Sequence, residues 1–148
     1  MLAGASRGLA ERGHDVSVVA RGAARLDALR SDRVTPIQVD YTDLDALDAA
    51  LSRAVAERGP FEIAVCWIRS WEPESLRHVA GALREGTPLY HVLGTTGTPA
   101  AELPGIDYRV VRLGRRGSRW LTNDEISSGV LEAIDREAAD FPVGERDP

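Results

Sequence analysis

Hydrophobic positions in this chain change between a helical spacing and short continuous runs, and this change predicts helices alternating with strands. Met1–Arg12 carries small or apolar side chains at a helical spacing, and Gly13 is placed to end that helix in a left-handed conformation. Val16–Ala20 is a short β-branched run, typical of a strand in a parallel sheet. The other expected strands are Val34–Val39, Phe61–Trp67, Pro88–Leu93 and Ile106–Leu113.

Three further helices are expected between and after these strands. Each is bounded by residues that cap, open or stop a helix, and Pro73 suits a first helical turn. The expected ranges are Thr42–Gly59, Pro73–Gly86 and Thr122–Glu137. The polar, proline-bearing segment 140–148 follows the last helix, and we expect it to be a flexible C-terminal tail.

The order of elements predicts an α/β fold class, a Rossmann-like doubly wound parallel sheet in a single three-layer domain over residues 1–139. Such a sheet opens with a strand, whereas this chain opens with a helix, so its first strand is expected to be absent from the chain. Because that strand is central, its absence leaves backbone groups without partners. Three arrangements answer this: the recorded start lies downstream of the true one, the flanking strands pair directly, or another chain supplies a strand. The first is favoured.

Composition narrows the classes of partner. The 148 residues carry a net charge of −5 with no basic stripe, which argues against a nucleic-acid partner. No apolar stretch has the length of a membrane span, no signal-peptide pattern is present, and Cys66 is the one cysteine. We therefore expect a cytoplasmic protein that binds a small-molecule substrate or ligand, and the incomplete sheet favours a homo-oligomer.

The segment Met1–Arg21, a helix, a strand and then an arginine, resembles the dinucleotide-binding end of the short-chain dehydrogenase/reductase family, especially its atypical members. The family signature is a strand, a Gly-x-x-Gly-x-x-Gly/Ala turn, a helix, a second strand and then Arg or Asp. Here only the end of that turn is present, with Ala3 or Gly4 at its last small position. The resemblance implies NADP as cofactor, with Arg21 holding its 2′-phosphate. The alternative is that Arg21 is an exposed arginine that simply follows a strand.

The resemblance also implies ligand-binding groups at the carboxyl ends of the strands. Asp40 follows the third strand of the family order, where relatives place an acid that contacts the adenine amino group, and Tyr41 lies beside it. Trp67 follows the fourth strand and is a candidate wall of the cofactor cleft. Each has a structural alternative: Asp40 as the residue before a helix cap, and Trp67 as a core aromatic.

The family usually moves its proton with a Tyr-x-x-x-Lys pair, whereas all 18 basic residues of this chain are arginines. The nearest equivalent is Tyr108 with Arg112, and Thr95 or Thr96 stands where the resemblance implies a catalytic serine. In the family the pair lies on a helix. Here Pro104-Gly105 favours a strand, which would place Tyr108 and Arg112 on one face as ordinary strand residues.

His91 is the other candidate acid or base, because a histidine titrates near neutral pH. It lies in the apolar run Pro88–Leu93, where a lone histidine is more often a structural residue. No two histidines, and not Cys66, share a spacing typical of metal ligands, so we expect no metal site.

Two classes of function follow. The leading hypothesis is an NADP(H)-binding, oxidoreductase-like protein without the usual Tyr-x-x-x-Lys pair. The alternative is a degenerate Rossmann scaffold, either a non-redox enzyme of lyase, isomerase or cyclase type or a non-catalytic protein that binds a small molecule or a partner.

Overall fold

The structure is a computed structural model that describes residues 1–100 and 103–146. The helices are α1 (Ala3–Glu11), α2 (Ala23–Asp27), α3 (Leu44–Arg58), α4 (Pro73–Gly81) and α5 (Asn123–Asp135). The strands are β1 (Val16–Ala20), β2 (Val34–Gln38), β3 (Ala64–Cys66), β4 (Pro88–Leu93), β5 (Asp107–Leu113), β6 (Arg115–Arg116), β7 (Arg119–Trp120) and β8 (Asp140–Val143).

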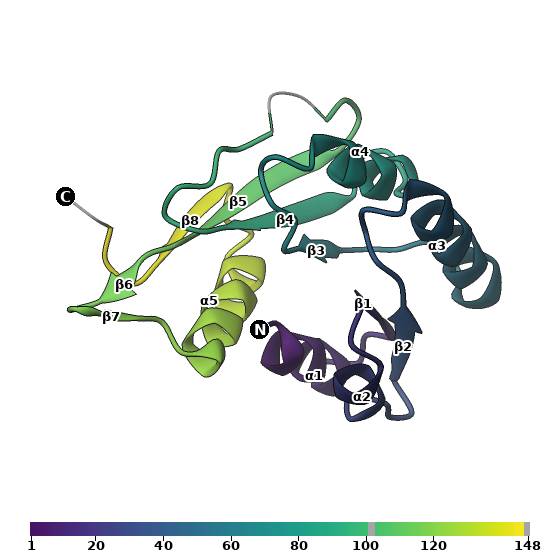
Figure 1. Cartoon of the computed structure of the whole chain (residues 1–148), viewed down its shortest axis with the longest axis horizontal. Coiled ribbons are helices and arrows are strands. Elements are labelled where there is room, and N and C mark those ends of the chain that lie inside the picture. The colour runs from purple at the N-terminus through teal and green to yellow at the C-terminus, as the bar shows by residue number, and fades with distance from the viewer. Residues whose placement is uncertain (101–102, 147–148) are drawn as a thin grey trace.

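The strands of the described ranges form three groups. β1 and β2 make a parallel pair, β3, β4, β5 and β8 make a parallel sheet in that order, and β6 and β7 make an antiparallel hairpin. Figure 1 shows the β1–β2 pair, with α1 and α2, set apart from the larger sheet. The expected α/β class with parallel sheets, and the parallel strand at Val16–Ala20, are confirmed.

β1 and β3, which the expected order places on either side of the missing strand, do not pair with each other. The N–H of Val16 and the C=O of Ala20 both bond to the β2 side. Because backbone groups alternate along a strand, Ser17 and Val19 turn theirs the other way. No strand in residues 1–100 and 103–146 pairs with that side, so direct pairing of the flanking strands is excluded.

Helices cover both faces of the four-stranded sheet, which gives three layers there. Tyr90 and Val92 of β4 are buried on one face with Val130 of α5. Leu89, whose side chain points to the opposite face, is buried with Leu76 of α4. The alternation along β4 therefore serves two separate cores.

Two glycines on one face of α1 bring that helix close to α5. An added Cβ would lie 3.0 Å from the Ser127 Cβ at Gly4 and 2.5 Å from the Leu131 Cδ1 at Gly8. Residues four apart share a helix face, so Gly4 and Gly8 form one smooth contact surface. This contact joins the β1–β2 part of the molecule to the larger sheet.

The segment Asp140–Val143 is a strand, β8, and not the start of a tail as the sequence predicts. Phe141 and Val143 point toward α5, where Gly129 leaves room: a Cβ on that glycine would lie 2.4 Å from a Val143 methyl carbon. Pro142 is tolerated because β8 is an edge strand. The alternation of polar and apolar residues in this segment is only four residues long, which is too short to predict a strand from the sequence. Residues 147–148 lie outside the described residues.

Three other parts of the chain differ from the sequence prediction, and each involves a short element. The run Phe61–Trp67 contributes only the three residues of β3. The five-residue helix α2 and the hairpin β6–β7 are too short to show a hydrophobic period in the sequence.

No helix within the described ranges is both long enough and apolar enough to cross a membrane.

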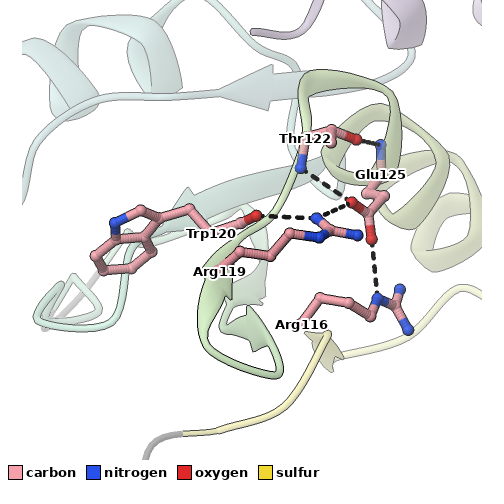
Figure 2. A network of polar contacts seen from close by, with 5 residues as sticks. All are labelled: Arg116, Arg119, Trp120, Thr122 and Glu125. Carbon is pink, nitrogen blue, oxygen red and sulfur yellow. Dashed lines mark hydrogen bonds and ion pairs between the residues drawn. The ribbon is translucent and has the colours of Figure 1, made fainter.

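The capping box at the start of α5 is present as predicted, and it also anchors the hairpin (Figure 2). Glu125 accepts hydrogen bonds from Arg119 at 2.7 Å, from Arg116 at 2.9 Å and from the Thr122 N–H at 3.1 Å. Arg119 also donates to the Trp120 carbonyl. These bonds, with that of Arg119 the largest cause, lower the pKa of Glu125 to about 2.

We predict that Gly129→Ala destabilises the protein by about 1 to 3 kcal/mol in urea unfolding, because the new methyl group meets the branched Val143 side chain. Gly81→Ala is the matched control: it lies at the end of α4 with nothing within 4 Å, so it should be neutral or stabilising. Equal behaviour of the two variants would contradict the packing of β8 on α5.

We predict that part of the stability is lost as pH falls from 4.5 toward about 2, because folded Glu125 holds its charge in that window and the unfolded chain takes up the proton first. Above that window the contribution is fully present. Glu125→Gln should flatten this part of the stability profile in acid unfolding, whereas Asp124→Asn on the same turn should leave it. A profile identical in Glu125→Gln and the parent chain would contradict the role of this network.

Candidate functional site

The carboxyl ends of β1 and β2 bring Arg21 and Asp40 together. Arg21 Nη1 lies 3.9 Å from Asp40 Oδ2, and the two side chains are 72% and 42% exposed. Asp40 also accepts bonds from the Thr42 N–H and hydroxyl, and these bonds lower the pKa of Asp40. Gln38 donates to the Arg21 carbonyl at 3.2 Å, which fixes the backbone there. The guanidinium of Arg21 is therefore charged, exposed and held by one long ion pair.

Tyr41 turns away from this pair and belongs to the core beneath α4. Its carbonyl accepts a 2.8 Å bond from the buried hydroxyl of Ser75, and its side chain packs with the cluster that holds Cys66 and Ile68. Tyr41 thus links the carboxyl end of β2 to the segment that follows β3. In the structure Tyr41 thus has a packing role in the core.

The loops after β3 and β4 lie side by side at the same edge. The Ser70 hydroxyl accepts a 2.9 Å bond from the Thr98 N–H, which joins them. Trp67 and Trp71 on the first loop are 40% and 69% exposed, and the Arg69 guanidinium lies 5.4 Å from the Trp71 ring. Trp67 is therefore not a buried core residue, and exposed aromatic surface marks this edge.

Thr95 and Thr96 occupy the middle of a tight turn after β4. The Gly97 N–H donates to the Gly94 carbonyl at 3.1 Å, and both threonines are exposed. They stand at the carboxyl edge, where the resemblance implies a catalytic hydroxyl.

His91 and Tyr108, separate candidates in the sequence, are in contact. His91 Nδ1 lies 2.7 Å from Tyr108 Oη, and Nε2 lies 2.7 Å from the Ile68 carbonyl. The Ala100 N–H donates to Tyr108 Oη at 2.9 Å. Burial lowers the pKa of His91 and raises the pKa of Tyr108.

Arg112 contacts β8 instead of Tyr108. Its Nε lies 3.1 Å from both carboxylate oxygens of Asp140. Within residues 1–100 and 103–146, no hydrogen bond or ion pair joins Tyr108 to Arg112, Thr95 or Thr96. The structure therefore brings Tyr108 to His91, but it joins neither Arg112 nor the two threonines to this pair.

Gly4 has a packing role on α1, since Ser127 of α5 occupies the space beside it. The helix begins after Leu2 with no side-chain cap and no acid in its first turn. Its first backbone N–H groups are thus available to an anion, as helix N-termini are in general.

Sequence reasoning missed a polar pair between α3 and α4. His78 Nδ1 lies 2.7 Å from Asp48 Oδ1, beside a shallow groove of about 500 Å³. The two residues are thirty positions apart on different helices, so no spacing signal links them. Among the described residues, no group of three or more His, Cys, Asp or Glu side chains is arranged to hold a metal ion.

The comparisons with known proteins agree at the level of fold. The sequence matches no protein-family model and no curated protein. A protein assigned to the short-chain dehydrogenase/reductase family from Aeromonas hydrophila subsp. hydrophila matches with a TM-score of 0.73 at 18% identity, over 98% of this chain and 93% of that one. A short-chain dehydrogenase from Streptomyces avermitilis matches with a TM-score of 0.72 at 14% identity, over 95% and 83% of the two chains.

A short-chain dehydrogenase/reductase from Serratia marcescens matches with a TM-score of 0.70 at 16% identity, over 96% of this chain and 91% of that one. This chain has a short-chain dehydrogenase/reductase fold. The resemblance inferred from Met1–Arg21 is thereby confirmed for the fold. At these identities the likeness carries the scaffold and not the assignment of individual site residues.

Proposed function

We propose that this chain is an NADP(H)-binding, oxidoreductase-like protein whose cofactor lies along the carboxyl edge of the strands. The observation that carries the proposal is Arg21, an exposed guanidinium directly after β1. A bidentate guanidinium is well suited to a phosphate monoester such as the 2′-phosphate of NADP. The short-chain dehydrogenase fold supports this placement.

Two further features fit the cofactor. The uncapped N-terminus of α1 offers backbone N–H groups to the pyrophosphate. Asp40, ionised and 3.9 Å from Arg21, is placed to accept a bond from the adenine amino group while it orients the arginine. A ligand phosphate would compete with Asp40 for Arg21. Because that ion pair is long and exposed, its replacement costs little free energy.

The bound cofactor would supply hydride transfer, and this chain's residues would bind and orient it. Arg21 holds the phosphate, Asp40 the adenine side, and exposed Trp67 supplies an aromatic wall. We expect Thr95 and Thr96, exposed in the turn after β4, to bond a substrate oxygen. Tyr108 and His91 donate and accept within the core, so their role is to hold the loops of the site.

The second candidate is a non-redox enzyme or a non-catalytic binding protein on the same scaffold. The observation that favours it is the engagement of Tyr108 with His91 and of Arg112 with Asp140. A proton-transfer pair in the usual family form would need both side chains free to face a substrate. Ligand binding without turnover is the outcome that separates this candidate from the first.

We predict saturable binding of NADPH and NADP⁺. Quenching of tryptophan fluorescence measures it, since the exposed Trp67 and Trp71 lie on the loop at the carboxyl end of β3. Arg21→Ala should weaken binding of both by roughly tenfold or more and leave NADH binding unchanged, because it removes a charge-assisted bond to the 2′-phosphate. Arg53→Ala, an exposed arginine of α3, is the control.

Absence of saturable binding to any nicotinamide nucleotide would overturn the proposal. Binding that Arg21→Ala leaves unchanged would overturn the role of Arg21. Binding without reduction of any carbonyl compound would favour the second candidate.

We further propose that the complete sheet is doubly wound. A further strand, outside the 148 residues, would lie between β1 and β3 and end beside Met1. The strand order β2-β1 and β3-β4-β5-β8 supports it, since one central strand would join the two sheets into the doubly wound order. Ser17 and Val19 point their backbone groups toward that position. A homo-oligomer formed at the same edges is the competing way to satisfy those groups.

We predict that the amide protons of Ser17 and Val19 exchange quickly in this chain. They should become protected in a chain extended upstream in frame, because a parallel strand would accept their hydrogen bonds. The amide of Val16, already bonded on the β2 side, is the internal control. An upstream reading frame without an apolar strand and a glycine-rich turn would contradict this part of the proposal.

A further inference from the structure

Three hydrogen bonds link Ala100, Tyr108, His91 and Ile68 in a chain, and elementary chemistry determines the donor in two of them. The Ala100 N–H can only donate, so Tyr108 Oη accepts from it. The Ile68 carbonyl can only accept, so His91 Nε2 carries a proton. The direction of the third bond depends on the charge of His91. In the neutral ring, which burial favours, Nδ1 is unprotonated and accepts from the Tyr108 hydroxyl. Neutral His91 is therefore the Nε2–H tautomer.

This chain of bonds connects the two loops at the carboxyl edge. Ile68 belongs to the loop between β3 and α4, and Ala100 to the segment between β4 and β5. The Ser70–Thr98 bond is exposed to solvent, whereas His91 is 2% exposed and beneath both loops. The buried contact is thus the stronger tether, because its bonds are shielded from water.

The same loops carry the residues of the proposed site. Trp67 and Trp71 lie on the first, and Thr95 and Thr96 on the turn that opens the second. Displacement of one loop relative to the other would separate the aromatic wall from the hydroxyl groups.

We propose that His91 is a positioning residue that holds these two loops together only in its neutral Nε2–H form, so that protonation of His91 separates them and weakens ligand binding at this edge. The statement about binding rests on the proposed function, whereas the statement about the loops does not.

Protonation would disrupt the chain for two reasons. A proton on Nδ1 would point at Tyr108 Oη, whose own proton would then lose its acceptor. The new charge would also be buried, and among the described residues no carboxylate contributes to the pKa of His91. The titratable groups that face His91 are Tyr108 on β5, Cys66 on β3 and, at longer range, Arg112. None of them supplies a negative charge at neutral pH.

The sign of the effect follows from burial. The pKa of folded His91 lies below its ordinary value of 6.5, so the unfolded chain takes up this proton first as pH falls. The tether is complete above pH 6.5 and is lost through the folded pKa of His91. Binding should weaken about tenfold for each pH unit below that folded pKa, since only the neutral fraction binds.

The first test is the nitrogen NMR spectrum of the unliganded protein, which distinguishes the tautomers of His91 directly. We expect a protonated Nε2 and an unprotonated Nδ1 at neutral pH, followed by protonation at a pH below 6.5 together with a change in tryptophan fluorescence. An Nδ1–H tautomer would overturn the proposal. Tryptophan fluorescence that does not change as His91 is protonated would also overturn it. This arm needs no variant and no cofactor.

The second test compares three variants over the same pH range. His91→Gln should remove the acid-induced fluorescence change, and Tyr108→Phe should show the acid signal already at neutral pH because the link to Ala100 is lost. His78→Gln, at the half-buried histidine of α4, should behave as the parent chain. A pH response that survives in His91→Gln or disappears in His78→Gln would overturn the proposal.

The third test repeats the NADPH titration at neutral and acid pH. A loss of affinity in acid that His91→Gln removes supports the link to the site. Absence of NADPH binding at every pH defeats the proposed function and leaves the loop tether to be judged by the first two tests.

Discussion

The close contact between α1 and α5 holds the β1–β2 pair, with its helices, against the larger sheet. β1 and β3 do not pair in the described part of the chain, so no sheet hydrogen bonds join the two halves there. Gly4 and Gly8 let α1 approach α5, and the Arg12–Asp135 ion pair at 3.0 Å extends the contact. On the other face, Arg58 donates to the Ser17 hydroxyl at 2.9 Å. Helix packing thus performs a task that sheet pairing performs in a continuous doubly wound sheet.

This arrangement decides where ligand chemistry can occur. Because the strands of each sheet are parallel, Arg21 and Asp40 lie at the carboxyl ends of β1 and β2, and Trp67 and Thr95 follow the carboxyl ends of β3 and β4. The carbonyl of Tyr41, bonded to Ser75, connects the two groups. The proposed site would therefore draw on both sheets, whose relative position the α1–α5 contact helps to hold.

All 18 Lys or Arg positions of the chain are arginine, and this affects both its chemistry and its packing. The planar guanidinium forms several bonds at once, as Arg112 does with both oxygens of Asp140 and Arg119 with Glu125 and Trp120. The arginine of the Tyr-x-x-x-Arg spacing is held in this way against β8. That leaves Arg21, with its single long contact, as the basic group of the candidate site best placed to meet an anion.

Local spacing and local hydrogen bonding were enough to predict the order of the four longer helices and of strands β1 to β5, together with the capping box at Thr122. The sequence also placed Arg21, Asp40 and Trp67 at strand ends, since position along the chain is enough for that. The tertiary structure alone decided that Gly4 serves helix packing, that Asp140–Val143 pairs as an edge strand, and that Tyr108 bonds to His91. Each of these depends on which distant residue lies opposite, and no local pattern records it. The two candidate residues for proton transfer met across neighbouring strands because β4 and β5 pair in one particular register, a property of the assembled sheet.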